Sequence, residues 1–253
     1  MAFISKITTP GGETYDIRDA NIINRNLLDN PDFRVNQRGA SGTISAEGYF
    51  VDRWKLVNGE VTVNPDGTLT LNGTISQTLE AAVGVGVTAS AGAGTASYDD
   101  STKTFTLTAS GEVVSWAKLE VGANATQFVP PHPAEELARC QRYFNSLFVN
   151  GIPVQFVGNG IAVSDSIATV LVNLPVAMRL PTPTVSLTGT LYLSDGNHTA
   201  ANSIAVQGIA GSYLNRNVLQ LNLTSDGVTL DRSAAYLLSR RDTDTALTVS
   251  AEL

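Results

Sequence analysis

The C-terminal part of the sequence contains turn-like segments in which aromatic side chains stand beside hydrogen-bonding ones. Flat aromatic rings can stack on the faces of sugar rings, and nearby polar groups can bond to their hydroxyls. This mix favours a glycan-binding surface, although ordinary surface turns often contain the same residue types. The residues that we predict to contact a ligand are Tyr192, His198, Tyr213, Asn215 and Arg216.

Residue types with catalytic or metal-binding chemistry are few. His132 and His198 are the only histidines and Cys140 is the only cysteine. A zinc site needs three or four ligands, and neither histidine has a partner at ligand spacing. The G-x-S-x-G element of a serine hydrolase is absent, and Asp99-Asp100 reads more simply as a turn than as a glycosidase pair or a calcium site. We therefore predict no catalytic residue, metal or cofactor, and no enzymatic activity, although a spatial Ser-His-Asp triad stays open.

The first half of the chain has two further features that can be mistaken for binding motifs. Trp54 and Trp116 lie in strands that alternate apolar and polar residues, so we expect them to pack in a core rather than to bind sugar. The Gly-rich stretch 81–97 has no strand-helix-strand context, and we therefore do not interpret it as a nucleotide-binding loop.

Composition restricts the partners. The chain of 253 residues has a net charge of −7, only 15% charged residues and no Lys/Arg-rich run, so we expect no nucleic-acid partner. No apolar stretch reaches the ~18 residues of a membrane helix, and the N-terminal residues do not resemble a secretion signal. Low charge, abundant Thr, Ser and Asn, and a single cysteine favour a homo-oligomer stabilised by packing between subunits.

The elements that carry these residues are predicted to be strands. Short alternating segments recur at intervals of about 8–12 residues, which is typical of an all-β sandwich or barrel. We predict an N-terminal segment (1–26) with a hairpin around Pro10-Gly11-Gly12, a jelly-roll-like β-sandwich (27–130), a linker helix (131–145) and a C-terminal β-sandwich (146–253).

A single helix is predicted, from about Ala134 to Asn145. Pro133 suits its first turn, and acidic residues at its start with basic residues at its end suit the helix dipole. Leu137, Cys140 and Phe144 fall on one face at helical spacing, so we expect this face to be buried.

Several segments together resemble tail-fibre-like or receptor-binding proteins of tailed bacteriophages and prophages that contain a carbohydrate-binding-module-like jelly roll. These segments are NLLDNPDFRVNQRG (26–39), YFVDRW (49–54), WAKLEVGANATQF (116–128) and EELARCQRYF (135–144). ITTPGGETYDIRDA (7–20) is similar to the leader of many phage structural proteins, and PVAMRLPTPT (175–184) to a segment of their distal domains. The first sandwich is short for this type of jelly roll, so sugar-binding strands or loops of the family can be missing.

The resemblance implies a homotrimeric virion protein, a tail fibre or tip made in the host bacterial cytoplasm. Residues 1–26 would attach it to other virion proteins, and residues 146–253 would contact a host-surface glycan or protein. Two alternatives stay open: a decoration or baseplate component without a receptor role, and a cellular carbohydrate-binding module. A polysaccharide-cleaving enzyme fits less well, because it would need a longer β-helix or a clear carboxylate site.

Overall fold

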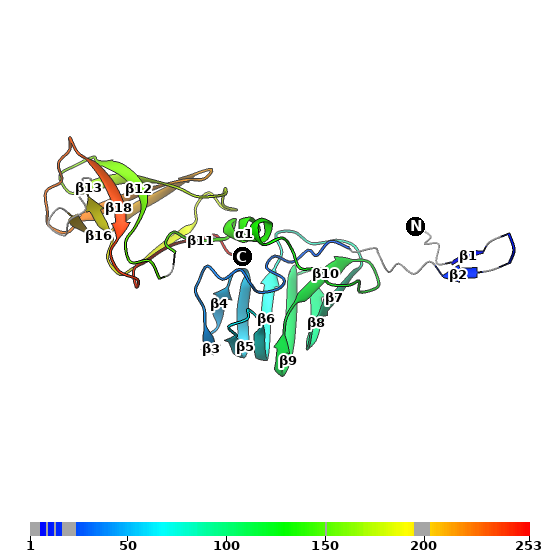
Figure 1. Ribbon diagram of the computed structural model, residues 1–253. Helices are drawn as coiled ribbons and strands as arrows, with labels where there is room; N and C mark the ends of the chain where they lie inside the picture. The colour runs from blue at the N-terminus through cyan, green and yellow to red at the C-terminus, as the bar shows by residue number, and fades with distance from the viewer. Residues whose placement is uncertain (1–5, 9, 13, 17–23, 150, 195–202) are drawn as a thin grey trace.

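A computed structural model describes residues 6–8, 10–12, 14–16, 24–149, 151–194 and 203–253. These residues form antiparallel sheets and one short helix, which confirms the predicted all-β class. In chain order there are an N-terminal hairpin, a first unit built on a six-stranded sheet, and a second unit built on a barrel (Figure 1).

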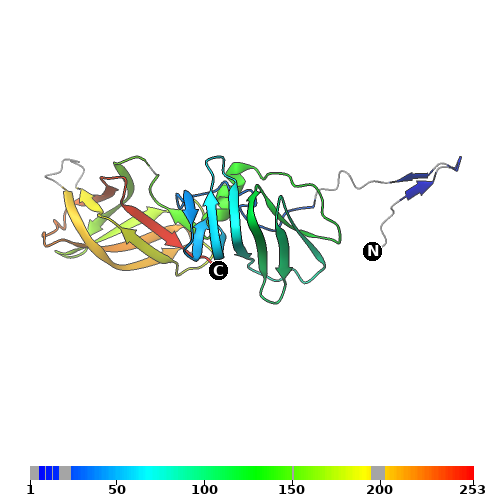
Figure 2. The same cartoon turned by 90° about the horizontal axis from the view of Figure 1, so that it is seen from below.

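The N-terminal hairpin pairs β1 (Lys6–Thr8) with β2 (Thr14–Asp16). Gly12 has a φ of 86°, which supports the turn predicted at Pro10-Gly11-Gly12. The hairpin stands apart from both other units in two perpendicular views (Figures 1 and 2).

The main sheet of the first unit has the order β3-β5-β6-β9-β8, with β4 paired to β5. Alternating apolar residues bury one face of it: Leu69 and Leu71 of β6 and Phe105 and Leu107 of β9 are fully buried. Trp54 lies among them, with its ring edge-on to Phe105, which confirms its predicted core position. The strands are β3 (Gly42–Ile44), β4 (Gly48–Val51), β5 (Trp54–Val63), β6 (Leu69–Thr78), β8 (Thr95–Asp99) and β9 (Thr104–Val114).

A smaller second layer covers the buried face of this sheet. It consists of β7 (Val87–Ala91) paired with β10 (Ala117–Val121), and of the irregular segment 24–41. Asn26 ties this segment to β10, because its side chain bonds to Ala117 O at 2.9 Å and accepts the Leu119 N–H at 3.1 Å. Asn26, placed at the end of the N-terminal segment by sequence, is therefore part of the first unit.

Helix α1 (Pro133–Gln141) is shorter than predicted. The chain leaves it to form β11 (Phe144–Ser146), which pairs with the C-terminal strand β19 (Ala246–Ser250). Cys140 and Phe144 are buried as expected, but Leu137 is 38% exposed and Glu136 is buried instead. The expected face is thus wrong at Leu137, because the buried face of α1 is rotated toward the polar loop at Asn30.

The second unit contains a closed six-stranded barrel in the order β12-β13-β17-β16-β15-β18. Beside it lies a three-stranded sheet, β11-β19-β14, with β14 spanning Thr184–Thr188. The structure therefore differs from two open sheets facing each other, because β15 pairs with both β16 and β18 and closes the ring. The barrel strands are β12 (Gln155–Ala162), β13 (Ile167–Asn173), β15 (Tyr192–Ser194), β16 (Ser203–Asn215), β17 (Val218–Ser225) and β18 (Ala235–Arg240).

Alternation explains how the barrel fills its interior. Leu219, Leu221 and Leu223 of β17 are fully buried, with the polar residues between them facing outward. Gly160 of β12 faces β13 so closely that a Cβ atom there would overlap the Thr169 carbonyl oxygen. A glycine in this strand therefore marks close approach of two backbones.

Candidate functional site

The residues predicted to bind a ligand fall into separate places. Tyr192 lies on β15, half-buried, with the Arg241 guanidinium 5.1 Å from its ring centre. His198 lies outside the described residues. Tyr213, Asn215 and Arg216 lie together at the hairpin between β16 and β17, and all three are exposed.

The hairpin presents its side chains from a defined turn. Arg216 has a φ of 57°, in the left-handed region that a tight turn requires, and Tyr213 is 65% exposed. The next residue, Asn217, accepts the Leu174 N–H at 2.7 Å, which fixes the turn to the end of β13. Tyr213 and Arg216, three residues apart, are thus both exposed at a turn that is bonded to the end of β13.

Tyr192 does not join this group. It pairs with Ala205, which lies eight residues before Tyr213 on the same strand (213 − 205 = 8). At about 3.3 Å per residue, the two tyrosines are separated by roughly 25 Å along β16. One small ligand therefore cannot contact both.

Trp116 is half-buried and not part of the core, contrary to the prediction. It lies between β9 and β10, and its ring stacks on Phe128 with centroids 5.1 Å apart and planes 9° apart. The alternating pattern ends at this position, which is why the sequence overestimated its burial.

A cluster of charges joins the first unit to the C-terminus of the chain. Arg53 is 1% exposed, and its guanidinium contacts Glu252 at 2.7 Å, Asp29 at 3.1 Å and the Thr78 carbonyl at 2.7 Å. Burial alone would lower the pKa of Arg53, but Glu252 and Asp29 raise it, so the guanidinium stays charged. We call Arg53, Arg38, Asp29 and Glu252 the joint cluster.

The remaining contacts of the joint cluster add aromatic rings. Arg38 contacts the second carboxylate oxygen of Glu252 at 3.0 Å and lies 3.8 Å above the centre of the Phe144 ring. Arg53 lies 3.5 Å above the centre of the Tyr143 ring. The Tyr49 hydroxyl donates to the Leu253 carbonyl, so the last two residues are both bound to the first unit.

Two buried carboxyl groups lie near this cluster. Burial raises the pKa of Asp52 to about 6, although its hydrogen bonds from Gln37 and the charge of Arg38 oppose the shift. Burial also raises the pKa of Glu136, against a hydrogen bond from the Asn30 N–H and the charge of Arg139. Raised carboxyl pKa values can mark a general acid, but Asp52 is fully buried and Glu136 is 2% exposed, so neither is open to a substrate.

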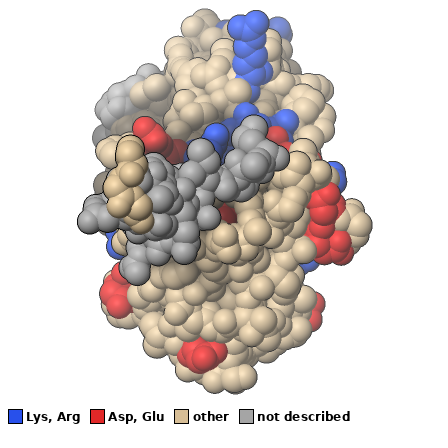
Figure 3. Space-filling model, turned by 90° about the vertical axis from the view of Figure 1, so that its right-hand side faces the viewer, with Lys and Arg blue, Asp and Glu red and all other residues tan. Residues whose placement is uncertain are grey.

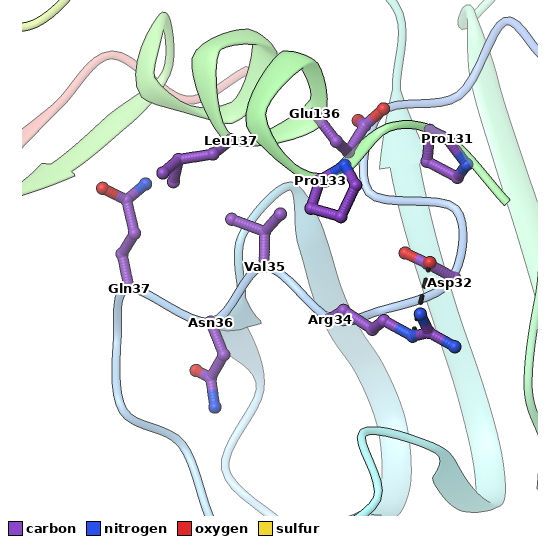
Figure 4. A pocket seen from close by; sticks show the side chains of 9 residues that line it. All are labelled: Asp32, Arg34, Val35, Asn36, Gln37, Pro131, Pro133, Glu136 and Leu137. Atoms are coloured by element: carbon purple, nitrogen blue, oxygen red, sulfur yellow. Dashed lines mark ion pairs between the residues drawn. The ribbon is translucent and has the colours of Figure 1, made fainter.

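A cleft of about 330 Å³ lies between α1 and the loop 32–37 (Figure 4). Val35, Pro133 and Leu137 form its apolar wall, and the Asp32–Arg34 ion pair lies at one side. Most of its polar groups are already bonded within the protein: Asn36 to Ala40, and Gln37 to Asp52 and Phe144. The cleft offers an apolar surface and one exposed guanidinium, not a set of reacting groups.

These contacts give the joint cluster a mechanical role. It holds the first unit, α1 and the C-terminal strand in one orientation by charge-assisted hydrogen bonds. The joint cluster was not among the predicted site residues, although the charged pair Asp52-Arg53 inside the apolar run from Tyr49 to Trp54 is a sequence signal of buried, paired charges.

Charge is sparse over the surface from which the N-terminal hairpin projects, where isolated acidic and basic groups stand in a mostly uncharged surface (Figure 3). Within the described residues, no helix is long and apolar enough to cross a membrane, and no group of three His, Cys, Asp or Glu side chains could hold a metal ion.

Comparison of the chain with protein-family models, with curated proteins and with solved structures finds no match.

Proposed function

We propose that this chain is a non-enzymatic structural protein of a tailed-bacteriophage virion, a tail fibre or tip protein that mediates attachment to the host surface. Residues 1–26 attach it to other virion proteins, the first unit acts as a spacer, and the second unit contacts a host glycan or protein. The assembly is a homotrimer. The observation that carries the proposal is the serial arrangement of hairpin, first unit and barrel (Figure 1).

The joint cluster supports this arrangement. A fibre or tip must hold its contact surface at a defined distance and orientation from the particle. Arg53 and Arg38 both bind Glu252, so the chain end returns to the first unit and closes the second unit against it. A flexible linker would hold no such orientation, whereas paired and hydrogen-bonded buried charges do.

The turn of Tyr213, Asn215 and Arg216 is the part of the second unit best suited to recognition. The exposed ring of Tyr213 can stack on a sugar, and the exposed amide and guanidinium of the same turn can bond to its hydroxyls. Loops held by a rigid barrel are common positions for binding residues. Tyr192 would take part only as a second contact, because of its distance along β16.

Two measurements test the proposal. Immunogold labelling with antibodies to the chain is expected to mark one end of phage particles from the producing cells. The purified chain is expected to bind host cells and to compete with phage adsorption, and Tyr213→Ala is expected to weaken both effects. Absence of the chain from particles would refute the virion role.

The second candidate is a decoration or baseplate component without a receptor role. It is favoured by the placement of the Tyr213–Arg216 turn. This turn is bonded to Leu174, and five residues later Arg179 donates its N–H to the Arg142 carbonyl beside α1. The turn therefore lies at the end of the barrel that is connected to the first unit. A turn close to the first unit is less accessible to a host surface than one at the far end of the barrel. Labelled particles whose adsorption is unaffected by the free chain would favour this candidate.

A further inference from the structure

The outer face of the barrel carries exposed apolar side chains on β12, on the segments just before and after it, and on the neighbouring strand β13. They are Ile152, Val154, Phe156, Ile161, Val163 and Leu171, each between 45% and 58% exposed. We call them the apolar ridge. We infer that the apolar ridge is the contact between copies of this chain, so that the ridges of the barrels meet around one symmetry axis in a homo-oligomer.

The ridge follows β12, with the exposed Asn159 as a polar residue within it. Phe156 and Ile161 point outward from β12, and Leu171 of β13 pairs with Asn159, which lies between them. Val154 and Phe156 line one shallow hollow with Ser239 and Arg241. Val163 extends the line into the turn, where its N–H bonds to the Ile167 carbonyl.

The ridge is also held firmly. The Gln155 side chain accepts the Val149 N–H at 2.8 Å and donates to the Ile152 carbonyl at 2.9 Å. Arg240, 2% exposed, donates to the Ile152 carbonyl at 2.8 Å and to the Val149 carbonyl at 2.6 Å. A buried guanidinium thus fixes the backbone of a loop whose apolar side chains remain exposed. Because the loop is already ordered, it loses little conformational entropy when a partner covers it.

The size of the ridge suits a protein interface. Six side chains at about half exposure present on the order of 500 Å², near the upper end of the ~300–600 Å² of the largest apolar patch on a typical monomer. A standard interface takes about 800 Å² from each partner and places its apolar residues at the centre. The ridge would supply most of such a centre.

The charge distribution indicates that the partner is a second copy of the chain. Between Phe144 and Met178, Asp165 is the only Asp, Glu, Lys, Arg or His. Identical ridges therefore oppose few charged groups when they meet about a symmetry axis, and Arg241, which lines the hollow beside Val154 and Phe156, is the cation at that end. An anionic membrane would be repelled by a chain of net charge −7. The barrel is closed, so a partner cannot add as a further strand and must pack on its face.

Sedimentation velocity of the full chain at micromolar concentration tests the inference. The wild-type chain is expected to be an oligomer, and Ile161→Asp to raise its dissociation constant roughly tenfold or more, because each copy would place a carboxylate in the contact. Val113→Asp is the matched control: Val113 lies on β9 of the first unit and is 59% exposed, against 58% for Ile161. It is expected to leave the oligomer unchanged.

Leu171→Asp serves as a second ridge variant, and circular dichroism confirms that each variant is folded. A monomeric wild-type chain would overturn the inference. So would an oligomer that survives both ridge variants, or one that Val113→Asp disrupts equally. The mass of the oligomer tests this inference, whereas particle labelling tests the virion role, so either one can fail while the other stands.

Discussion

Arg53 and Glu252 are separated by 199 residues in the chain, and their side chains meet at 2.7 Å with almost no exposure to solvent. This ion pair joins the start of β5 to the residues that follow β19. Breaking a buried pair by removing one partner leaves an uncompensated charge. The orientation of the two units therefore depends on the last residues of the chain.

Glu252→Gln is predicted to lower the free energy of unfolding by about 3–5 kcal/mol, because Arg53 and Arg38 would both lose their carboxylate partner. Urea denaturation at pH 7 measures the change. Arg34→Gln is the control: it breaks the Asp32–Arg34 pair, in which Arg34 is 64% exposed, and is expected to cost under ~1 kcal/mol. Equal effects of the two substitutions would show that the joint cluster is not a buried ion-pair network.

Asp52 is predicted to make stability depend on pH. Its pKa is about 6 in the folded protein and 3.8 in the reference state, so between these values the folded state binds more protons than the unfolded state. Stability from this group is therefore lost as pH rises from about 4 to 6, by on the order of 2–3 kcal/mol. Arg38 and Glu252 face the same group and shift its pKa in opposite directions.

The measurement is the urea midpoint between pH 4 and 7 for the wild type and for Asp52→Asn. Carboxylates with lowered pKa values, such as Asp242, act in the opposite direction, so only the difference between the two proteins isolates Asp52. The variant is expected to lack the decrease between pH 4 and 6. Parallel curves for the two proteins would contradict the raised pKa of Asp52.

Alternation along the strands was sufficient to predict the all-β class, and it explains why Leu69 and Leu71 share the buried face of β6. It could not predict barrel closure, because closure depends on β15 pairing with two distant strands, β16 and β18. Helical spacing predicted a helix to Asn145. The chain leaves the helix earlier because pairing of Phe144–Ser146 with β19 outweighs local propensity.

The predicted ligand residues show the same limit. Turn chemistry grouped Tyr213, Asn215 and Arg216 correctly, since they are neighbours in the chain. Nothing in the sequence fixed the position of Tyr192 relative to them, because that position depends on strand register. The helix-dipole argument placed Glu136 in the first turn but could not predict its burial, which depends on contacts with Asn30 and Arg139.

Cys140 is predicted to be unreactive in the native protein. Burial raises the pKa of its thiol well above the ordinary range, and only the thiolate reacts with disulfide reagents. A chromogenic disulfide reagent at pH 8 is expected to label no thiol in buffer and one thiol per chain in denaturant. Rapid labelling in buffer would show that α1 opens readily from the first unit.

Two truncations that differ only by residues 24–26 are predicted to have different effects on the free energy of unfolding. Removal of residues 1–23 is expected to change the free energy of unfolding by under ~0.5 kcal/mol. Removal of residues 1–26 also removes Asn26, which bonds to Ala117 and accepts the N–H groups of Leu28 and Leu119, so a loss of about 2–3 kcal/mol is expected. Urea denaturation of both truncated chains tests this, and equal stabilities would contradict it.

Arg216 allows a test that separates recognition from stability. Its φ of 57° is costly for a residue with a Cβ atom, so Arg216→Gly is predicted to raise the free energy of unfolding by about 0.5–1 kcal/mol, and Arg216→Val to lower it by about 1 kcal/mol or more. Arg232→Gly is the control, because Arg232 is also an exposed arginine in a turn but is not among the residues with positive φ. At position 232 a glycine only adds backbone freedom to the unfolded chain, so Arg232→Gly is expected to lower the free energy of unfolding by about 0.5–1 kcal/mol. Thermal unfolding measures the stability of all three variants.

Since Arg216→Gly removes the guanidinium without weakening the fold, reduced binding of this variant to host cells would come from the lost side chain, whereas unchanged binding would exclude Arg216 from the contact.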